Sequence, residues 1–228
     1  TCTLTSLSPG TTYYVRSYAV NGAGVAYGEE ISFKTLASLP TIGASSVSNI
    51  TSSSATISSS VVSDGGAVIT ERGVVYRNSA NPTIDNATKV VIGSGNFACS
   101  LSSLSYATTY YVRSYAVNEI GVAYGEEISF TTLAILPTMG ISSVSGVTSS
   151  SATISSSVTS DGGATVTERG VVYSTSSNPT TSNSKIVSGS GLGEFKCTIN
   201  SLSYATTYYV RAYAKNSAGT TYGSEVTI

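Results

Sequence analysis

Apolar and polar residues alternate with a period of two along short segments of this chain, and Gly, Asn, Asp, Ser or Pro separates the segments. This spacing is typical of β-strands with one buried face, and it differs from the 3.6-residue spacing of an amphipathic helix. In the middle of the chain, strands are expected at Ser45–Ile50, Ala55–Val61, Val68–Arg77, Lys89–Ile92, Phe97–Leu101, Thr109–Val117 and Glu127–Thr131. The sequence therefore predicts an all-β protein.

The turns between these strands have a characteristic composition. An Asp-Gly-Gly turn at residues 64–66 returns at residues 161–163, and an Asn-Pro pair at residues 81–82 returns at residues 178–179. Gly adopts left-handed backbone conformations without steric cost, and Asn-Pro pairs mark connections between elements. Seven short strands separated by such turns are the number expected of an immunoglobulin-like sandwich.

The chain repeats itself at the spacing of a whole small domain. The segment TTYYVRSYAVN begins at Thr11 and again at Thr108, and TTYYVRAYAKN begins at Thr206, so the offsets are 97 and 98 residues. This spacing is too long for a solenoid repeat and fits a compact domain. We therefore expect the C-terminal strands of a partial repeat at residues 1–36, a full repeat at residues 37–133 and a second full repeat at residues 134–228.

The links between repeats are short and apolar. TLASLPT (Thr35–Thr41) and TLAILPT (Thr132–Thr138) each contain one Pro and no Gly, so they are expected to pack against the adjoining domain ends and to give a semi-rigid rod. Residues 1–36 align with residues 98–133, so the first copy lacks four strands. Two interpretations stay open: the chain is an excerpt of a longer array, or another chain completes the first copy.

Composition excludes some partners. Only 10% of the residues are charged, and Lys+Arg 11 against Asp+Glu 12 gives a net charge of −1. This balance provides no basic surface for a nucleic acid backbone. No apolar run approaches the 18 or so residues that span a bilayer, so no membrane span is expected in this segment. The chain has no His, which removes ordinary Ser–His and Cys–His couples and His-based metal sites.

Cys2, Cys99 and Cys197 stand at the repeat offsets, one in each copy. An internal disulfide within a repeat is therefore excluded. Each Cys of the full repeats lies in an alternating segment, which places it on the same face as apolar neighbours. A small buried side chain with an inert thiol is the plain interpretation, and an intermolecular disulfide or a lipid site are the alternatives.

The repeated strand also predicts a candidate contact face. If the first Tyr of each TTYYVR segment faces inward, the alternate residues face outward and place an Arg between two Tyr rings. These residues are Tyr14, Arg16, Tyr18, Tyr111, Arg113, Tyr115, Tyr209, Arg211 and Tyr213. The face could stack on sugar rings or on a partner protein, or it could be a cation–π ladder that stiffens an exposed sheet.

Other repeated charges have simpler explanations. Neighbours on a strand point to opposite faces, so Glu29-Glu30 and Glu126-Glu127 do not form the carboxylate pair of a glycosidase and are expected at a solvated strand edge. Glu71-Arg72 and Glu168-Arg169 are expected to form ion pairs with Arg113 and Arg211, the alternative being a ligand clamp. Asp64 and Asp161 provide one carboxylate per turn, too few for a firm calcium site. We predict no catalytic residues, metal or cofactor.

The segment Leu7–Gly24, LSPGTTYYVRSYAVNGAG, closely resembles the tyrosine-corner strand of the fibronectin type III family, with the pattern L-x-P-G-T-x-Y-x-V-x-x-x-A-x-N-x-x-G. SATISSSV, at residues 54–61 and 151–158, is similar to the second strand of that family. Tyr13, Tyr110 and Tyr208 hold the corner position, where the ring is buried and the hydroxyl bonds to upstream backbone. The chain departs from the family in two ways: Ser59 and Ser156 replace the usual core Trp, and Tyr-Ala replaces Pro-Gly before the later corners.

The order of ERGVVYS, NPT, GSG and TTYYVRAYA is similar to the bacterial branch of this family, found in secreted and cell-surface proteins. The resemblance implies tandem sandwiches and a non-enzymatic spacer or adhesin stalk located outside the cell or on its surface. The alternatives are a module that binds glycan or protein through the Tyr-Arg-Tyr face, and a subunit of a self-assembling surface filament. The expected partners are neighbouring repeats, cell-surface glycan or protein, or further copies of the chain.

Overall fold

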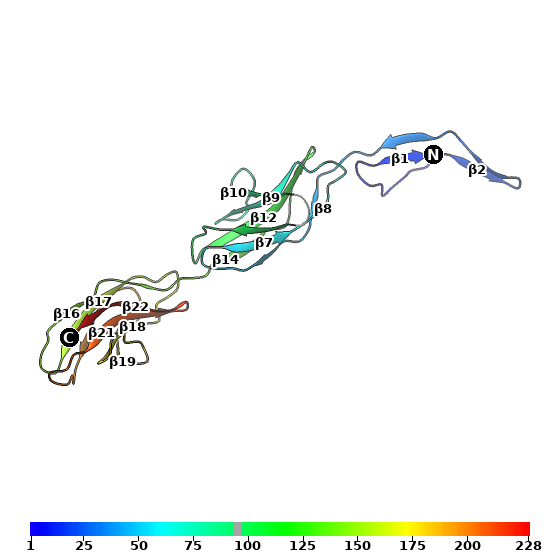
Figure 1. Ribbon diagram of the computed structural model, residues 1–228. Helices are drawn as coiled ribbons and strands as arrows, with labels where there is room; N and C mark the ends of the chain where they lie inside the picture. Colours follow the sequence, from blue (N-terminus) through cyan, green and yellow to red (C-terminus); the bar gives the residue numbers. More distant parts are fainter. Residues whose placement is uncertain (94–96) are drawn as a thin grey trace. The chain divides into compact units, whose positions relative to one another are not determined.

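The computed structural model describes residues 1–93 and 97–228, and throughout this described part the regular structure is antiparallel β-strand, with no helix (Figure 1). None of the described segments is a helix long and apolar enough to cross a membrane. Part of the first Gly-Ser-Gly copy, at residues 93–95, lies outside the described residues. The all-β prediction is confirmed.

The chain divides into two compact units. Unit 1 comprises residues 1–50, 54–102 and 109–130, and unit 2 comprises residues 51–53, 103–108 and 131–228. Unit 2 thus contains the third copy together with residues 51–53, 103–108 and 131–133 of the second copy.

The first copy forms two small sheets in unit 1. Strand β1 (Thr12–Val15) pairs with β4 (Ile31–Lys34), and β2 (Tyr18–Asn21) pairs with β3 (Gly24–Tyr27). All four strands carry mainly exposed side chains, which include Tyr14, Tyr18 and Phe33.

The second copy has a larger set of sheets. One sheet has the order β10-β9-β12-β13, with β14 also paired to β12, and a second has the order β11-β7-β6. A short pair, β5 with β8, completes it. The bounds are β5 (Thr41–Ile42), β6 (Ser46–Ser48), β7 (Ala55–Ser59), β8 (Val61–Ser63), β9 (Glu71–Arg77), β10 (Thr88–Val91), β11 (Phe97–Leu101), β12 (Thr109–Asn118), β13 (Gly121–Tyr124) and β14 (Ile128–Thr131).

The third copy in unit 2 repeats this pattern. One sheet has the order β19-β18-β21-β22, and the other joins β15, β16 and β20 to β17. The bounds are β15 (Thr138–Met139), β16 (Ser143–Ser145), β17 (Ala152–Ser160), β18 (Glu168–Ser174), β19 (Ser184–Val187), β20 (Gly193–Ile199), β21 (Tyr209–Asn216) and β22 (Gly219–Thr227).

Alternate residues of both sheets meet in one core. In unit 2, Ile154 of β17 and Cys197 of β20 belong to the same buried cluster as Val171 of β18 and Ala212 of β21. The period-two alternation therefore predicted the inward faces correctly, because side chains on a strand alternate between its two faces.

Ser59 and Ser156, the serines expected in place of a core Trp, are buried. The Ser45 hydroxyl lies 3.1 Å from the hydroxyl of Ser59 and 2.7 Å from that of Ser114. In unit 2, Ser142 lies 3.1 Å from Ser156 in the same way. These hydrogen bonds satisfy hydroxyl groups that burial would otherwise leave without partners.

The seven strands expected in the second copy are all present; Phe97–Leu101 has its predicted bounds, and the others have shifted ends. The predicted strand Ala55–Val61 is divided into β7 and β8, and the predicted Val68–Arg77 begins at Glu71. Two strands were missed, β5 in the apolar link and β13 after the turn that follows β12. Both strands are short. Strand β5 pairs with β8, about twenty residues further along the chain, and β13 pairs with β12 across a two-residue turn.

Candidate functional site

The corner tyrosines anchor the turn that precedes each repeated strand. The Tyr13 hydroxyl accepts a hydrogen bond of 2.8 Å from the Ser8 N–H, and Tyr208 accepts one of 3.2 Å from Ser203. The Tyr110 ring stacks on Phe130 at 5.9 Å between ring centroids. In all three copies the residue before the Thr-Thr-Tyr-Tyr segment is left-handed, with φ of 60° at Gly10, 48° at Ala107 and 52° at Ala205. Replacement of Pro-Gly by Tyr-Ala therefore leaves the turn intact.

The repeated Arg packs on a Tyr of the following strand. The guanidinium of Arg113 lies 4.6 Å from the centroid of Tyr124 in β13, and its Nε donates to the Gly125 carbonyl at 3.1 Å. Arg211 has the same arrangement with Tyr222 at 4.9 Å. In the first copy Arg16 lies 5.3 Å from Tyr27. The cation–π contact of each Arg is thus made with a Tyr of the following strand.

Two members of the predicted contact face are fully buried. Tyr115 and Tyr213 have no exposed surface, whereas Tyr18 at the equivalent position is 71% exposed. Tyr115 lies opposite Gly73 of β9, and a Cβ at Gly73 would come within 3.1 Å of the Tyr115 ring and 2.0 Å of the Val90 carbonyl oxygen. The ring therefore lies against glycine backbone. The expectation that Tyr115 and Tyr213 belong to an exposed face is wrong.

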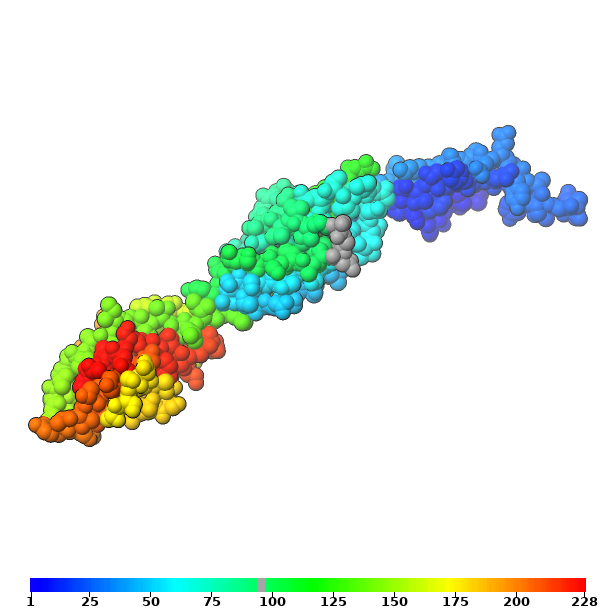
Figure 2. All heavy atoms as spheres, viewed as in Figure 1, coloured from blue at the N-terminus to red at the C-terminus, as the bar shows by residue number. Residues whose placement is uncertain are grey.

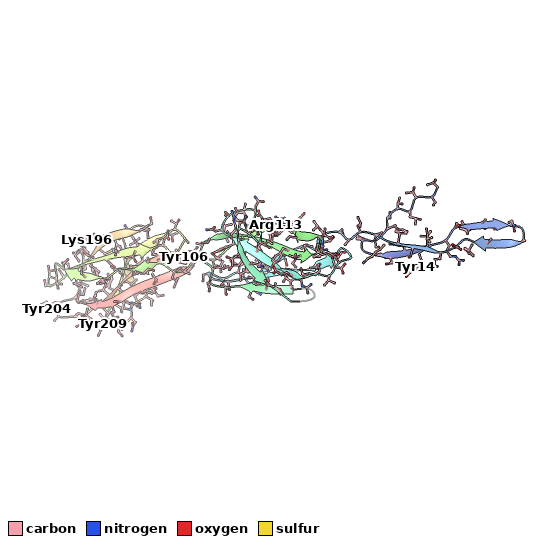
Figure 3. All side chains as sticks on the ribbon, turned by 90° about the horizontal axis from the view of Figure 1, so that it is seen from above. Tyr14, Tyr106, Arg113, Lys196, Tyr204 and Tyr209 are labelled. Atoms are coloured by element: carbon pink, nitrogen blue, oxygen red, sulfur yellow. The ribbon has the colours of Figure 1, made fainter. Side chains whose placement is uncertain are left out.

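The remaining members of that face differ in exposure. Tyr14 in the first copy is 69% exposed, and Tyr111 and Tyr209 are half-buried. Figure 3 labels Tyr14, Arg113 and Tyr209 on their strands. A contact surface on the full repeats is thereby reduced to one Tyr and one half-buried Arg in each copy.

A partly buried hydrogen bond joins the buried Tyr of each full repeat to a carboxylate. The Tyr115 hydroxyl donates to Glu71 at 2.7 Å, and the Tyr213 hydroxyl donates to Glu168 at 2.6 Å. Burial raises the pKa of Tyr115 above its ordinary value, and the bond to Glu71 raises it further. The same bond is the largest cause that lowers the pKa of Glu71.

Each of these carboxylates also binds a lysine. Lys89 Nζ lies 2.9 Å from Glu71, and Lys185 Nζ lies 2.9 Å from Glu168. The prediction that Arg113 and Arg211 form these ion pairs is wrong, because Lys89 and Lys185 are the partners. Strand β9 lies between β10 and β12, so a residue of β10 reaches Glu71 while Arg113 is held by the strand on the other side.

The arginines that follow these carboxylates in sequence, Arg72 and Arg169, donate hydrogen bonds to backbone carbonyls of loops. Arg169 Nη1 donates to the carbonyls of Gly191, Leu192 and Gly193 at 3.2, 2.6 and 3.1 Å, and its guanidinium lies 5.3 Å from the Phe195 ring. Arg72 donates to the Gly93 carbonyl in the second copy. Each of these arginines therefore binds backbone of its own copy.

The second Glu before the last strand holds a turn. Glu127 accepts a hydrogen bond of 2.5 Å from the Asn81 N–H, and Glu225 accepts one from Asn178. The Tyr124 hydroxyl accepts the Ile84 N–H at 3.0 Å, close by in the same connection. Glu127 is thus more than a solvated residue of a strand edge, since it fixes the Asn-Pro turn.

The cysteines fall into two groups. Cys99 and Cys197 are buried among apolar neighbours, and burial raises the pKa of both thiols. Cys2 is exposed. The expectation of a buried thiol therefore fails for Cys2, which lies in the copy where the described strands leave the inward face uncovered.

The links are hydrogen-bonded on both sides. Leu36 accepts the Gly10 N–H at 3.1 Å, and two residues later the Ser38 N–H donates to the Gly65 carbonyl at 2.9 Å. In unit 2, Leu133 accepts the Ala107 N–H at 3.2 Å, and the Ile135 N–H donates to Gly162 at 2.9 Å. One residue, Ala37 or Ala134, separates the two bonded positions of each link.

A buried asparagine fixes the second side of each link. Asn118 Nδ2 donates to the Ser38 carbonyl at 2.7 Å and to the Asp64 carbonyl at 2.9 Å, while its Oδ1 accepts the N–H of Ile120 at 2.9 Å. Oδ1 also accepts the Gly121 N–H at 3.3 Å, so the amide uses both donors and both acceptor positions.

Asn216 repeats the arrangement. It donates to the carbonyls of Ile135 and Asp161 at 2.8 and 2.7 Å. Sequence reasoning did not select these two asparagines. Their signal was the Ala-x-Asn-x-x-Gly run, in which Asn is unchanged in all three copies while its neighbours vary.

The Asp-Gly-Gly turn of one copy touches the corner turn of the copy before it. A Cβ at Gly163 would lie 2.2 Å from Ala107 Cβ and 3.2 Å from the Tyr106 ring. A Cβ at Gly66 would lie 2.4 Å from the Pro9 carbonyl oxygen. Both turns are closed by an Asp side chain that accepts the N–H of the second Gly, at 2.7 Å in Asp64 and 2.9 Å in Asp161.

No family model and no curated protein sequence matches this chain. Within the described residues there is no group of three or more His, Cys, Asp or Glu side chains that could hold a metal ion. The contacts that recur are those of the links, the buried Tyr-Glu-Lys group and the Arg-Tyr stack.

Proposed function

We propose that the chain is part of a non-enzymatic spacer or adhesin stalk of a bacterial extracellular or cell-surface protein. In this proposal the copies are tandem immunoglobulin-like sandwiches of the fibronectin type III kind, and their junctions give the array a semi-rigid character. The observation that carries the proposal is the repetition of the same hydrogen-bonded link in unit 1 and in unit 2.

The chemistry of the link supports a mechanical role. A flexible linker leaves its backbone groups to water, whereas these links bond to the preceding corner and to the following turn. The buried amide of Asn118 or Asn216 adds a bond to a link carbonyl, and this donor would be left unsatisfied if the link moved away. Such junctions resist bending more than a Gly/Ser linker of the same length.

The side chains that repeat also support a structural role. The carboxylates of Glu71 and Glu168, the two buried tyrosines and the two stacked arginines are each occupied by contacts within their own copy. Groups that recur in both full copies and bind neighbours in the same copy stabilise the repeat. This arrangement suits a spacer better than a reaction centre.

Distances between spin labels on two copies test the proposal. Labels would be attached at Asn78→Cys and Thr175→Cys, two exposed positions, in a chain that carries Cys2→Ser. A semi-rigid junction predicts one narrow distance distribution by pulsed electron paramagnetic resonance. Adding Asn216→Ala should broaden it. A broad distribution in the chain with Asn216 intact would contradict the spacer proposal.

A further inference from the structure

The corner turn of the third copy has the sequence and conformation of the corner turn of the second copy. Residues 204–208 and residues 106–110 both have the sequence Tyr-Ala-Thr-Thr-Tyr. Ala205 is left-handed like Ala107, and the Thr206 hydroxyl donates to the Tyr204 carbonyl at 3.2 Å, as the Thr108 hydroxyl does to Tyr106 at 2.9 Å. The two turns therefore present the same surface.

In the second copy this surface has an occupant. Ala107 and Tyr106 lie against Gly163, and the Ala107 N–H donates to the Leu133 carbonyl at 3.2 Å. In unit 1 the corresponding Gly10 lies against Gly66, whose carbonyl oxygen would be 2.2 Å from a Cβ at Gly10. An Asp-Gly-Gly turn thus packs on the corner turn in both junctions of the chain.

In the third copy the same surface is exposed. Tyr204 is 83% exposed, against 43% for Tyr106, and this difference matches what the Asp-Gly-Gly turn covers. A hollow of about 380 Å³ adjoins it, with Leu202, Tyr204, Ala205, Thr206, Tyr208 and Ile228 in its lining. Figure 2 shows residues near 200–205, in orange, projecting at the end of unit 2, and Figure 3 shows Tyr106 and Tyr204 at its two ends.

We propose that this surface of the third copy is a docking site for the Asp-Gly-Gly turn of a further repeat of the same type. The Ala205 methyl group would pack on the second Gly of that turn, as Ala107 packs on Gly163, and the Ala205 N–H would donate to a carbonyl of the incoming link. Any Cβ on that Gly would collide with Ala205. The surface therefore selects an Asp-Gly-Gly turn that is preceded by an apolar link. That turn must not already be packed on another corner turn.

A second copy of this chain does not meet the requirement. Its turns at residues 64–66 and 161–163 already lie against Gly10 and Ala107. The occupant is therefore a repeat whose turn is not already packed on a corner. This inference rests on the proposed function only in treating the copies as members of one array.

The test uses the full chain extended by one repeat. Ile228 aligns with Phe130, so a copy of residues 131–228 is attached directly after Ile228. Accessibility of the Tyr204 ring is then measured by nuclear magnetic resonance with a photoexcited dye. Docking predicts that the Tyr204 signal falls to roughly half of its value in the 228-residue chain, since Tyr106 in the occupied site is half as exposed.

The matched control carries Gly163→Val in the attached copy only. Docking predicts that Tyr204 then regains the accessibility it has in the 228-residue chain. A second control inserts Gly-Ser-Gly after the attached copy of Leu133, which leaves the turn unchanged and separates it from its link. It guards against a Val variant that fails to fold, and its Tyr204 should also become more accessible.

Equal Tyr204 accessibility in the 228-residue chain, the extended chain and both controls would overturn the docking site. A fall in Tyr204 accessibility when the concentration of the 228-residue chain is raised would overturn the choice of occupant in favour of a second copy. Neither result depends on the distance between spin labels, so failure of docking and failure of the spacer proposal are distinguishable.

Discussion

The first and second copies contain the same eleven residues, TTYYVRSYAVN, and fold them differently. In the second copy the segment lies in one strand, β12 (Thr109–Asn118), which pairs with β9 along seven residue pairs. In the first copy it forms two strands, β1 (Thr12–Val15) and β2 (Tyr18–Asn21), separated by Arg16 and Ser17. The burial of Tyr115 and the exposure of Tyr18 follow from the presence or absence of a neighbouring strand with the sequence ERGVVY.

This difference shows what each strand contributes. The repeated segment carries its Arg-Tyr stack and its terminal Asn turn in both copies, because both depend on residues close in sequence, at 16–27 in the first copy and at 113–124 in the second. The Tyr-Glu-Lys group and the asparagine bonds to the link appear only where β9 and the Asp-Gly-Gly turn are present. Local contacts are thus separable from contacts that require the complete repeat.

Gly73→Val is expected to have the largest effect, because it would remove the buried position that distinguishes Tyr115 from Tyr18. A Cβ at Gly73 would lie 2.0 Å from the Val90 carbonyl oxygen, so β9 would have to separate from β10 and the Tyr115 ring would lose its position. We expect a loss of about 3 kcal/mol in unfolding free energy of the second copy, measured by chemical denaturation. Val122→Ile on β13 is a control with a small effect. A loss below about 0.5 kcal/mol would contradict the role given to Gly73.

Asn118→Ala tests the link contact against its counterpart in the first copy. Asn118 is buried and makes four hydrogen bonds, whereas Asn21 is exposed and accepts one from Ala23. Removing the Asn118 amide should cost about 2 kcal/mol, since the Ser38 and Asp64 carbonyls each lose a donor. Asn21→Ala should cost much less in the same denaturation experiment. Equal losses from the two variants would show that the link contact adds no stability.

Tyr115→Phe removes a single hydroxyl. The partly buried bond to Glu71 should be worth about 1.5 kcal/mol, because its acceptor is charged. Tyr18→Phe is the matched control, since Tyr18 holds the equivalent position in the first copy and is 71% exposed. The difference between the two variants in thermal unfolding isolates the bond. If Tyr115→Phe were as neutral as Tyr18→Phe, the hydroxyl bond would contribute nothing.

The smallest effect is the pH dependence of the same group. The Tyr115 hydroxyl and Lys89 lower the pKa of Glu71 below its ordinary value of 4.5, and Tyr213 and Lys185 do the same for Glu168. A lowered pKa stabilises the folded state above pH 4.5, and this stability is lost as pH falls through the lower folded value. We expect thermal midpoints to fall between pH 6 and pH 3. The fall should be smaller in a Glu71→Gln, Glu168→Gln variant, and an unchanged slope would contradict it.

Sequence reasoning predicted the strands and the inward faces well because both depend on local alternation. Phe97–Leu101 was placed at its observed bounds, and Cys99 was placed on the buried face. It failed for Tyr115, since alternation gives the side of the sheet and not the exposure on that side. The exposure depends on Gly73, which lies forty-two residues away and whose missing side chain admits the ring.

The partners of the charged residues and the contacts of the links could not be predicted from local sequence patterns either, because they depend on residues far apart in the chain. The ion pair of Glu71 depends on whether β10 or β12 supplies the closer cation, which follows from the order of strands in the sheet. Asn118 binds Ser38, eighty residues away in the chain. Repetition of Asn in all three copies was visible, but its acceptors are backbone carbonyls, which leave no trace in the sequence.

The single residue between the two bonded positions of each link has a consequence for digestion of the chain. A protease must draw several consecutive residues into an extended conformation in its cleft before it can cut. At Ala37 and Ala134 only one residue is free of backbone bonds to the preceding corner or the following turn. The links should therefore be as resistant to cleavage as the strands, although linkers between domains are commonly the first places to be cut.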